Sequence, residues 1–317
     1  MIYNSLQGLI VINKPSGITS HTVVQRVKKI LRVRKAGHTG TLDPFATGVL
    51  PICINEATKL SPFLLEEEKG YEGLFRLGIE TDTQDITGRI ISTKDSIDIK
   101  VSDIEKAFQK FRGSINQVPP MYSALKHKGT PLYLLARQGK EVERKPREVE
   151  IKELSVLNIE LPWISFSVAC SKGTYIRTLV NDIGKNLGCG ACLEKLKRTR
   201  SGKFLLENSV NLETLKSTSL EKIEANWILS PTQALSSFPA VTVDEEISQN
   251  IRQGKVITLG ELRGKASPPI PLKGISKVLN AQNKLVAIVE TSDPVCFGNN
   301  RNWEDPAWRL IRVFNFD

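Results

Sequence analysis

The sequence has few histidines and cysteines, and this scarcity limits the metal sites it can build. It holds three histidines, and its five cysteines are scattered from Cys53 to Cys296. Only Cys189 and Cys192 form a C-x-x-C pair, and no second pair or H-x₃₋₅-H pattern supplies the four ligands of a closed zinc site. We therefore expect no metal, and we interpret these two thiols as small buried side chains.

Long apolar runs and nucleotide-binding motifs are also missing. No apolar run approaches the ~18–20 residues of a membrane span. The first residues lack a cationic stretch followed by an apolar stretch and a cleavage site, so we expect a cytoplasmic protein without a membrane partner. No Walker loop, G-x-G-x-x-G fingerprint or G-x-S-x-G elbow occurs, which argues against nucleotide hydrolysis, a dinucleotide cofactor and a serine nucleophile.

What the chain does contain fits a globular protein of two parts. Its 317 residues are 40% hydrophobic, and this length exceeds the ~250–300 residues of a usual single core. From about Phe238 onward the sequence pattern changes to short strand-like apolar runs separated by turns that contain Gly and Pro. We therefore assign residues 1–236 to a large domain and 237–317 to a small β-rich module with its own core.

Both periodicities of a mixed α and β protein occur in the large domain. Residues 9–12, 48–54 and 71–77 read as strands. Val23 to Leu31 has helical spacing with cations on the other face, and Ser20 or Thr19 precedes it as a cap. Val101 to Phe111 predicts an amphipathic helix with a capping-box pattern at Ser102 and Glu105. We expect an α/β fold of the α+β type with flanking helices.

Positive charge is the strongest compositional signal. The formal net charge is +10. Residues 126–147 carry seven Lys/Arg against two Glu, and residues 172–203 carry eight Lys/Arg against two acids, so these segments are +5 and +6 and the remainder is about −1. Concentrated positive charge suits a polyphosphate ligand, because each neutralised phosphate releases counterions. Nucleic acid is favoured over two merely solvated surfaces, which usually carry mixed signs.

The loop "GHTGTLDPFATG" at residues 37–48 offers one reactive group, Asp43. Its three glycines permit positive φ and a close approach of a bulky ligand to the backbone. Taken by itself, the loop also fits a turn in which Asp43, followed by Pro44, caps a helix or closes an Asx turn. The residues of the loop alone do not decide between these readings.

The loop and its flank, "GHTGTLDPFATGVL", resemble the signature of the TruB family of pseudouridine synthases, which make pseudouridine 55 in the T-arm of transfer RNA. The resemblance covers most of residues 8–205. Six further blocks match in order: "NKPSGITS", "EATKLS", "KGYEG" with "LGIETDTQDITG", "PPMYSALKHKG", "SKGTYIRTLVNDIG" and "LKRTRSGKF".

This resemblance implies that Asp43 is the catalytic aspartate and that Arg177 is its ion-pair partner. Tyr71 matches the tyrosine that lies against the flipped uracil and is a candidate to remove a sugar proton. The carboxylate either adds to C1′ or stabilises a glycal-type intermediate, and the resemblance leaves both routes open. Neither route needs a cofactor.

Further positions match the family's substrate-binding residues. His38 matches a histidine that helps to hold the T-loop, Tyr175 and Leu196 match pocket residues, and Lys14 and Lys59 either meet phosphate or brace loops. Residues 119–147 resemble the thumb insertion of the bacterial enzymes, which folds over the T-arm. Within it we expect phosphate contacts from Lys126, Lys128, Arg137 and Arg144.

The implied protein is a tRNA pseudouridine-55 synthase with a pseudouridine synthase fold, a mixed and largely antiparallel sheet, and a PUA-like RNA-binding module at the C-terminus. Since the related guide-RNA-dependent enzymes lack this thumb, we expect a monomer that needs neither guide RNA nor a protein partner. Two alternatives are a non-catalytic RNA chaperone and a pseudouridine synthase acting on another uridine.

Overall fold

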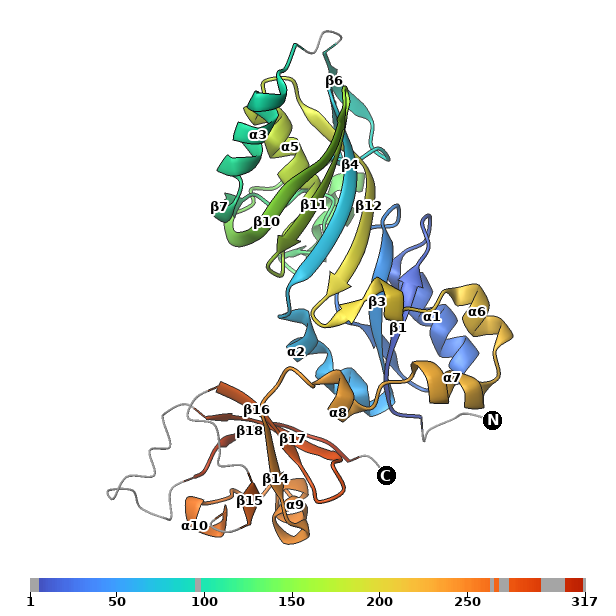
Figure 1. Ribbon diagram of the computed structural model, residues 1–317, viewed down its shortest axis with the longest axis vertical. Helices are drawn as coiled ribbons and strands as arrows, with labels where there is room; N and C mark the ends of the chain where they lie inside the picture. Colours follow the sequence, from blue (N-terminus) through green and yellow to red (C-terminus); the bar gives the residue numbers. More distant parts are fainter. Residues whose placement is uncertain (1–5, 95–97, 263–264, 268–273, 292–305, 316–317) are drawn as a thin grey trace.

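The computed structural model describes residues 6–94, 98–262, 265–267, 274–291 and 306–315. It has a long shape, with a large sheet above and a smaller C-terminal sheet below (Figure 1). Cys296 lies outside the described residues. Within the part of the chain that is described, no helix is long and apolar enough to cross a membrane.

The large sheet has nine strands, and seven of them follow the order β1-β3-β12-β4-β11-β10-β7. All pairings are antiparallel except the short contact between β3 and β12. The sheet is therefore mixed and largely antiparallel, as expected. Its strands are β1 (Gly8–Lys14), β2 (Ala36–His38), β3 (Thr47–Ile54), β4 (Lys69–Leu77), β7 (Gly113–Gln117), β10 (Arg147–Glu160), β11 (Trp163–Cys170), β12 (Ala191–Ser201) and β13 (Phe204–Leu205).

Helices and two small hairpins surround this sheet. The hairpins are β5 (Ile79–Thr81) with β6 (Ile90–Thr93), and β8 (Lys126–His127) with β9 (Thr130–Pro131). The helices up to the C-terminal module are α1 (Ser20–Leu31), η1 (Asn55–Leu60), α2 (Ser61–Leu65), α3 (Val101–Lys110), α4 (Leu132–Arg137), α5 (Ile176–Asn186), η2 (Leu206–Asn208), α6 (Leu212–Ser217), α7 (Leu220–Trp227) and α8 (Pro231–Ala234).

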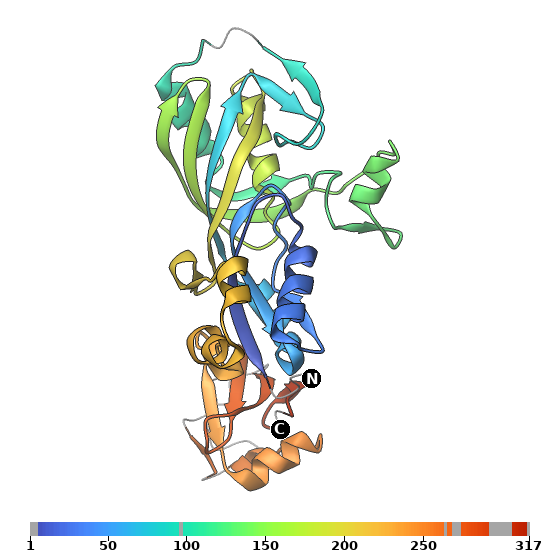
Figure 2. The ribbon, with the colours of Figure 1, turned by 90° about the vertical axis from the view of Figure 1, so that its right-hand side faces the viewer.

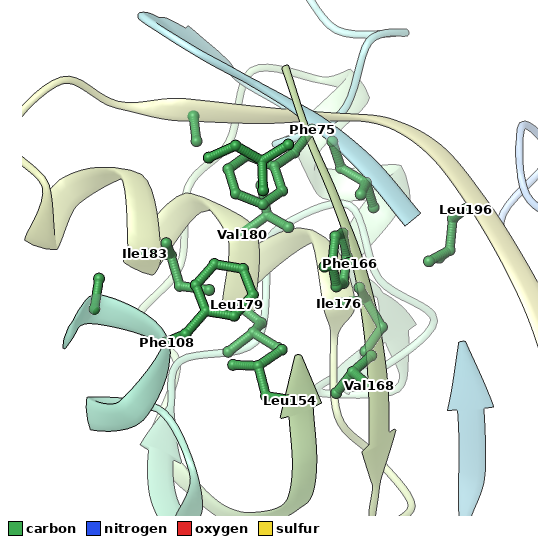
Figure 3. Close-up of a cluster of buried hydrophobic side chains, with 14 of the residues drawn as sticks. Phe75, Phe108, Leu154, Phe166, Val168, Ile176, Leu179, Val180, Ile183 and Leu196 are labelled. Carbon is green, nitrogen blue, oxygen red and sulfur yellow. The ribbon is translucent and has the colours of Figure 1, made fainter. Parts of the chain in front are cut away.

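Helices α3 and α5 cover one face of β4, β10, β11 and β12 and enclose the first core (Figure 3). Helix α5 contributes Ile176, Leu179, Val180 and Ile183, whose i, i+3, i+4, i+7 spacing forms a single apolar face. The predicted capping box at α3 is wrong. The helix begins at Val101, and Lys100 precedes it without a side-chain cap hydrogen bond.

Helix α1 packs on the other half of the sheet. Its buried valines and Leu31 meet the apolar face of β1 and β3, together with α6 and α7. The predicted helix is confirmed, and Thr19 is its N-cap, since its hydroxyl accepts from the backbone N–H of Thr22 at 3.0 Å. The large sheet therefore has two halves that are covered by helices. One half contains β1 and β3, and the other contains β12, β4, β11 and β10.

The C-terminal module is a five-stranded sheet in the order β15-β14-β16-β17-β18. It has a core of its own, around Val241 and Ile251, and also shares an apolar cluster with β1 and η1, to which Phe314 contributes. The boundary we place at residues 236–237 falls just before its first strand. The elements are β14 (Ala240–Val243), α9 (Glu245–Arg252), α10 (Leu259–Leu262), β15 (Ala266–Ser267), β16 (Gly274–Leu279), β17 (Leu285–Thr291) and β18 (Arg309–Val313).

The two halves of the large sheet meet where β3 runs parallel to β12 for two residue pairs, Thr47 with Lys197 and Gly48 with Arg198. Gly48 has φ +102°, and a Cβ there would lie 2.2 Å from the carbonyl oxygen of Arg198. Only glycine therefore fits this crossing, and the loop that carries Asp43 is attached directly to it.

We predict that Gly48→Ala lowers the free energy of unfolding by about 2–4 kcal/mol, because backbone strain and overpacking add. Gly113→Ala is the matched control, since Gly113 has φ +84° and a Cβ there would meet no atom within 4 Å. The control should lose only the strain component, about 1–2 kcal/mol. Denaturant titrations of the two variants measure the difference. Equal losses would show that the crossing tolerates a side chain.

Candidate active site

Three side chains fix the loop between β2 and β3, each from a different element. Lys14, at the end of β1, donates to the carbonyls of Pro44 at 3.0 Å and Ala46 at 2.7 Å. The Ser20 hydroxyl, at the start of α1, accepts from the Leu42 N–H and donates to the Leu42 carbonyl.

Arg198, on β12, donates to the carbonyls of Val49, Gly40 and Thr41 at 2.7, 3.0 and 3.5 Å. Its side chain is fully buried, as is that of Lys14. The loop is thus held on both sides of Asp43 by cations that bind backbone oxygen, which leaves the carboxylate of Asp43 to pair with another cation.

That partner is Arg177, 134 positions further along the chain. Its Nε lies 2.8 Å from Asp43 Oδ2, and its Nη2 donates to Oδ1 at 3.2 Å. A planar guanidinium that meets both oxygens fixes the orientation of the carboxylate. The Arg177 side chain is only 4% exposed, whereas a third of Asp43, 33%, is open to solvent. The pair is therefore buried on the arginine side and accessible on the aspartate side.

Arg177 is itself held by a second set of acceptors. Its Nη1 donates to the Thr83 carbonyl at 2.9 Å, and its Nη2 donates to the Tyr122 carbonyl at 3.0 Å. Asp85, which is buried, places Oδ2 3.5 Å from Nη1. Sequence reasoning missed Asp85, because "TDTQDITG" has the composition of a turn. The only available signal was its place in a block that matches the family.

The charges around Asp43 act in opposite directions on its pKa. Burial raises the pKa of the Asp43 carboxyl above the ordinary aspartate value, and the negative charge of Asp85 adds to this. Arg177 opposes the rise most strongly, and Lys14 opposes it more weakly. The site therefore depends on its cations to keep the aspartate ionised.

Two tyrosines are also placed at this site. Tyr71 lies on β4, paired with Arg198 of β12, and packs against the first core. Burial raises the pKa of its phenol, and Arg198 opposes this rise. Tyr175 is the residue before α5, and its backbone is fixed by a reciprocal pair of hydrogen bonds to the Gln117 side chain at 2.8 and 3.0 Å. Burial also raises the pKa of the Tyr175 phenol, and the charge of Asp43 adds a smaller rise to the pKa of both phenols.

The two remaining residues predicted to contact the base or the extruded loop, Leu196 and His38, lie on β12 and β2. Leu196 is 6% exposed on β12 and belongs to the first core, at its edge in Figure 3. His38 ends β2, and its Nδ1 accepts from the Gly40 N–H at 3.4 Å, so it belongs to the Asp43 loop. Burial and the Arg198 charge lower the pKa of His38, which favours the neutral ring.

The two lysines predicted to meet phosphate or brace loops have separate places. Lys14 braces the Asp43 loop, and its Nζ is fully committed to carbonyls, including that of Pro15. Burial lowers its pKa to about 8. Lys59 lies on η1, where it pairs with Glu56 at 2.5 Å and donates to the Val313 carbonyl of the C-terminal module at 3.5 Å. It is not part of the Asp43 cluster.

The thumb insertion, residues 119–147, extends sideways from the body and contains β8, β9 and α4 (Figure 2). Lys126, Lys128 and Arg137 are exposed on it. Arg144 has a different role, because it donates to the Pro119 carbonyl at 3.2 Å and pairs with Glu141. It closes the base of the insertion and is less available to phosphate than we expected.

The second basic segment, residues 172–203, is not one continuous RNA-binding face. Arg177 and Arg198 are buried at the Asp43 loop. Lys172 pairs with Glu66, Arg200 lies 3.7 Å from Glu68, and Lys203 donates to the Ser236 hydroxyl at 2.6 Å. The expectation that the whole segment faces RNA is wrong for Arg177 and Arg198, whereas five of its lysines are exposed, namely Lys172, Lys185, Lys195, Lys197 and Lys203.

Cys189 and Cys192 are buried, in agreement with the interpretation as core thiols. Burial raises the pKa of Cys192 to about 11. Within the described ranges, no group of three or more His, Cys, Asp or Glu side chains is arranged to hold a metal ion.

Comparison with known families agrees with this geometry. Residues 28–176 match the TruB family pseudouridylate synthase (N terminal domain), and residues 177–235 match the tRNA pseudouridylate synthase B C-terminal domain. The chain belongs to the TruB family. The boundary between the two matched family regions falls just before Arg177, so Asp43 lies in the first region and its ion-pair partner Arg177 is the first residue of the second.

Curated relatives are similar over nearly the whole length. The tRNA pseudouridine synthase B of Geobacter sulfurreducens is 42% identical over 310 residues, 98% of this chain and 100% of the relative. That of Syntrophus aciditrophicus is 42% identical over 313 residues, with 98% and 99% coverage. The Burkholderia pseudomallei protein is 43% identical over 296 residues, with 93% and 96% coverage.

Solved structures of TruB relatives share the fold. A chain of an archaeal box H/ACA sRNP Nop10–Cbf5 complex aligns with TM-score 0.75 and 25% identity, over 99% of this chain and 88% of that chain. A chain of a Cbf5–Nop10–Gar1 complex aligns with TM-score 0.74 and 28% identity, over 96% and 84%. The expected fold class, a pseudouridine synthase fold of mixed α and β structure, is confirmed.

We predict opposite shifts of the Asp43 pKa on removal of the charge of Arg177 and of Asp85. Arg177→Gln removes the cation that lowers this pKa and should raise it further. Asp85→Asn removes a carboxylate that raises it and should lower it, provided that Arg177 stays in place. Carboxyl ¹³C chemical shifts of aspartate-labelled protein, followed through a pH titration, measure both. Shifts of the same sign in two folded variants would contradict the assigned electrostatics.

Proposed function

We propose that this protein isomerises uridine 55 in the T-arm of transfer RNA to pseudouridine, with Asp43 as the catalytic group. The observation that carries the proposal is the Asp43–Arg177 pair, in which an accessible carboxylate is oriented by an arginine buried in the fold. The curated relatives named tRNA pseudouridine synthase B support transfer RNA as the substrate. The TruB resemblance supports position 55.

The chemistry requires one ionised carboxylate at the sugar. In the isomerisation the C1′–N1 bond breaks, a C1′–C5 bond forms, the proton on C5 is lost and N1 gains one, so no oxidant or cofactor takes part. An ionised Asp43 can add to C1′ or stabilise a glycal-type intermediate. Both routes fail if the carboxyl is protonated, because a neutral acid is neither a nucleophile nor a counter-charge.

Tyr71 and Tyr175 flank this carboxylate in the proposed mechanism. Burial raises the pKa of the Tyr71 phenol, so the phenol is protonated and neutral at rest and must give up its own proton before it can act as a base. We assign Tyr71 to the face of the flipped uracil and to removal of the sugar proton. Tyr175, Leu196 and His38 complete the surface around the base and the extruded loop.

The substrate must be an RNA whose target base leaves its stack. Base extrusion costs a few kcal/mol, which phosphate contacts and stacking offset. The exposed cations of the thumb, Lys126, Lys128 and Arg137, are placed on a projecting arm suited to this task. We assign the C-terminal module as a PUA-like domain that binds the same RNA.

The protein acts without guide RNA or an obligate protein partner in this proposal, as a monomer in the cytoplasm. Support comes from the thumb and from curated relatives that match over their full length. The structural neighbours were solved in complexes with Nop10 and, in one case, Gar1. The competing possibility is therefore that this chain also acts within a complex of several proteins. A non-catalytic chaperone is disfavoured, since binding alone gives no reason to orient Asp43 with Arg177.

We predict that Asp43→Asn reduces the single-turnover rate on unmodified transfer RNA by more than about 10³-fold, because the amide keeps the shape but not the charge. Its RNA affinity should stay within a few-fold. Asp182→Asn is the matched control, since Asp182 is a half-buried aspartate on α5 away from the pair. Pseudouridine mapped at nucleotide resolution reports both rate and position. Modification of a different uridine would refute the assignment to position 55.

We predict that Lys126→Gln, Lys128→Gln and Arg137→Gln together weaken binding far more than chemistry. A deletion of the whole thumb is unsuitable, because the Tyr122 carbonyl within it binds Arg177. The slope of log affinity against log salt should fall by roughly 0.7–0.9 for each phosphate interaction that the substitutions remove. The rate at saturating RNA should stay near that of the unaltered protein. An unchanged slope would mean that these cations do not touch RNA.

A further inference from the structure

The first 42 residues of the chain contain seven cations and no acid, and Asp43 is the first acidic residue. One of the seven, Lys14, is buried in the Asp43 loop. The other six lie between positions 26 and 35, on α1 and the turn after it: Arg26, Lys28, Lys29, Arg32, Arg34 and Lys35. Outside residues 126–147 and 172–203 the net charge of the chain is about −1, and this near-neutral total conceals the concentration of positive charge at positions 26–35.

These six side chains are unneutralised. Lys28 is half-buried and the other five are exposed. None of the six charged groups makes an ion pair or donates a hydrogen bond to any residue in the described ranges. An ordinary solvated face carries both signs, so six cations without one acid are a marked departure. We call this group the α1 basic surface.

The turn that carries its last members is rigidly held. The side chain of Asn55 accepts from the backbone N–H groups of Arg34 and Lys35, both at 3.1 Å, and donates to the Leu6 carbonyl at 2.8 Å. The backbone N–H of Asn55 donates to the Lys35 carbonyl at 2.9 Å. A fixed turn places its charges at fixed points, so less ordering entropy opposes binding than for a loose segment.

The surface has a defined relation to the candidate active site. The first residue of α1, Ser20, is bonded to Leu42 beside Asp43. The 12 residues of α1 span about 18 Å, so the cations lie toward the helix end that points away from this contact. In Figure 2 helix α1 (blue) and the thumb (green) lie on the same side of the large sheet.

We propose that the α1 basic surface binds the phosphate backbone of the substrate RNA, several nucleotides away from the target uridine. RNA is favoured over other anionic partners because the first residue of α1 holds the Asp43 loop and because α1 and the thumb lie on the same side of the large sheet. The thumb and the α1 basic surface then hold one RNA from two directions. This inference rests on the proposed function for the identity of the RNA, and it adds a binding surface that the thumb does not supply.

The test compares two triple variants of the full chain. Lys29→Gln, Arg34→Gln and Lys35→Gln remove three exposed charges of the surface. The matched control changes Lys106, Lys216 and Lys222 to Gln, three exposed lysines on α3, α6 and α7. Binding to unmodified transfer RNA is titrated at several salt concentrations, and the single-turnover rate is measured at saturating RNA. Circular dichroism and thermal melting establish that each variant is folded.

The α1 variant should bind at least about ten-fold more weakly near physiological salt, and its salt slope should fall by about 2 to 3 in magnitude, while the control changes little. Its rate at saturation should equal that of the unaltered protein, since none of the three residues belongs to the catalytic group. Equal effects of the two variants, or an unchanged slope, would overturn the proposal. The proposal would also be overturned if the α1 variant kept its RNA affinity but no longer bound anionic phospholipid vesicles that the unaltered protein binds, because the surface would then serve a membrane.

The two proposals fail separately. If the unaltered protein forms no pseudouridine but its RNA binding still depends on the α1 basic surface, then the proposed function fails and the surface stands. If it forms pseudouridine 55 and the α1 variant binds as tightly as the control, then the surface assignment fails and the function stands.

Discussion

The ion pair between Asp43 and Arg177 is the interaction on which the rest of the site depends. It joins a loop of the first sheet half to a helix of the second half, across the only parallel contact among the described strands of the large sheet. Because Arg177 is almost fully buried, its charge cannot be screened by water and must be met by oxygen acceptors within the fold. The Thr83 and Tyr122 carbonyls and Asp85 supply them. Arg177 therefore fixes three parts of the site at once: the loop between β5 and β6, which carries Thr83 and Asp85, the base of the thumb at Tyr122, and the carboxylate of Asp43.

Other buried cations in and near this site donate to backbone carbonyls and not to carboxylates, so their positive charge is not neutralised. Lys14 and Arg198 hold the Asp43 loop through five carbonyls in and beside it, and Lys69 donates in the same way to the Leu65 carbonyl. Burial lowers the pKa of Lys14 and of Lys69 to about 8. A carboxylate partner would neutralise each of these charges, whereas carbonyl dipoles leave them positive. The charge of Lys14 then opposes the effect of burial on the pKa of Asp43 and favours the ionised aspartate on which the proposed chemistry depends.

Positive charge in this protein thus has two distinct uses that the net charge of +10 does not separate. Arg177, Arg198 and Lys14 are internal and position the loop. Lys126, Lys128 and Arg137 of the thumb and five of the six cations of the α1 basic surface are exposed, and helix α1 and the thumb lie on the same side of the large sheet. Of the internal cations, Arg177 and Lys14 favour the ionised form of one carboxylate, and the exposed cations are suited to a polyanion. Both uses occur together in residues 172–203, where Arg177 and Arg198 are buried and five lysines are exposed, namely Lys172, Lys185, Lys195, Lys197 and Lys203.

The sequence by itself determined the family and the main helices and strands, and it singled out Asp43 as the candidate reactive group. Valine spacing placed α1, the alternation in residues 71–77 placed β4, and the loop "GHTGTLDPFATG" singled out its aspartate. It could not separate Arg144 and Arg198 from solvated cations, nor find Asp85 in a turn-like segment, because local composition is the same in both cases. Only the tertiary structure decided these roles. A buried charge is defined by the acceptors that surround it, and for Arg198 these lie about 150 positions away, brought within hydrogen-bond distance by the register of β3 against β12.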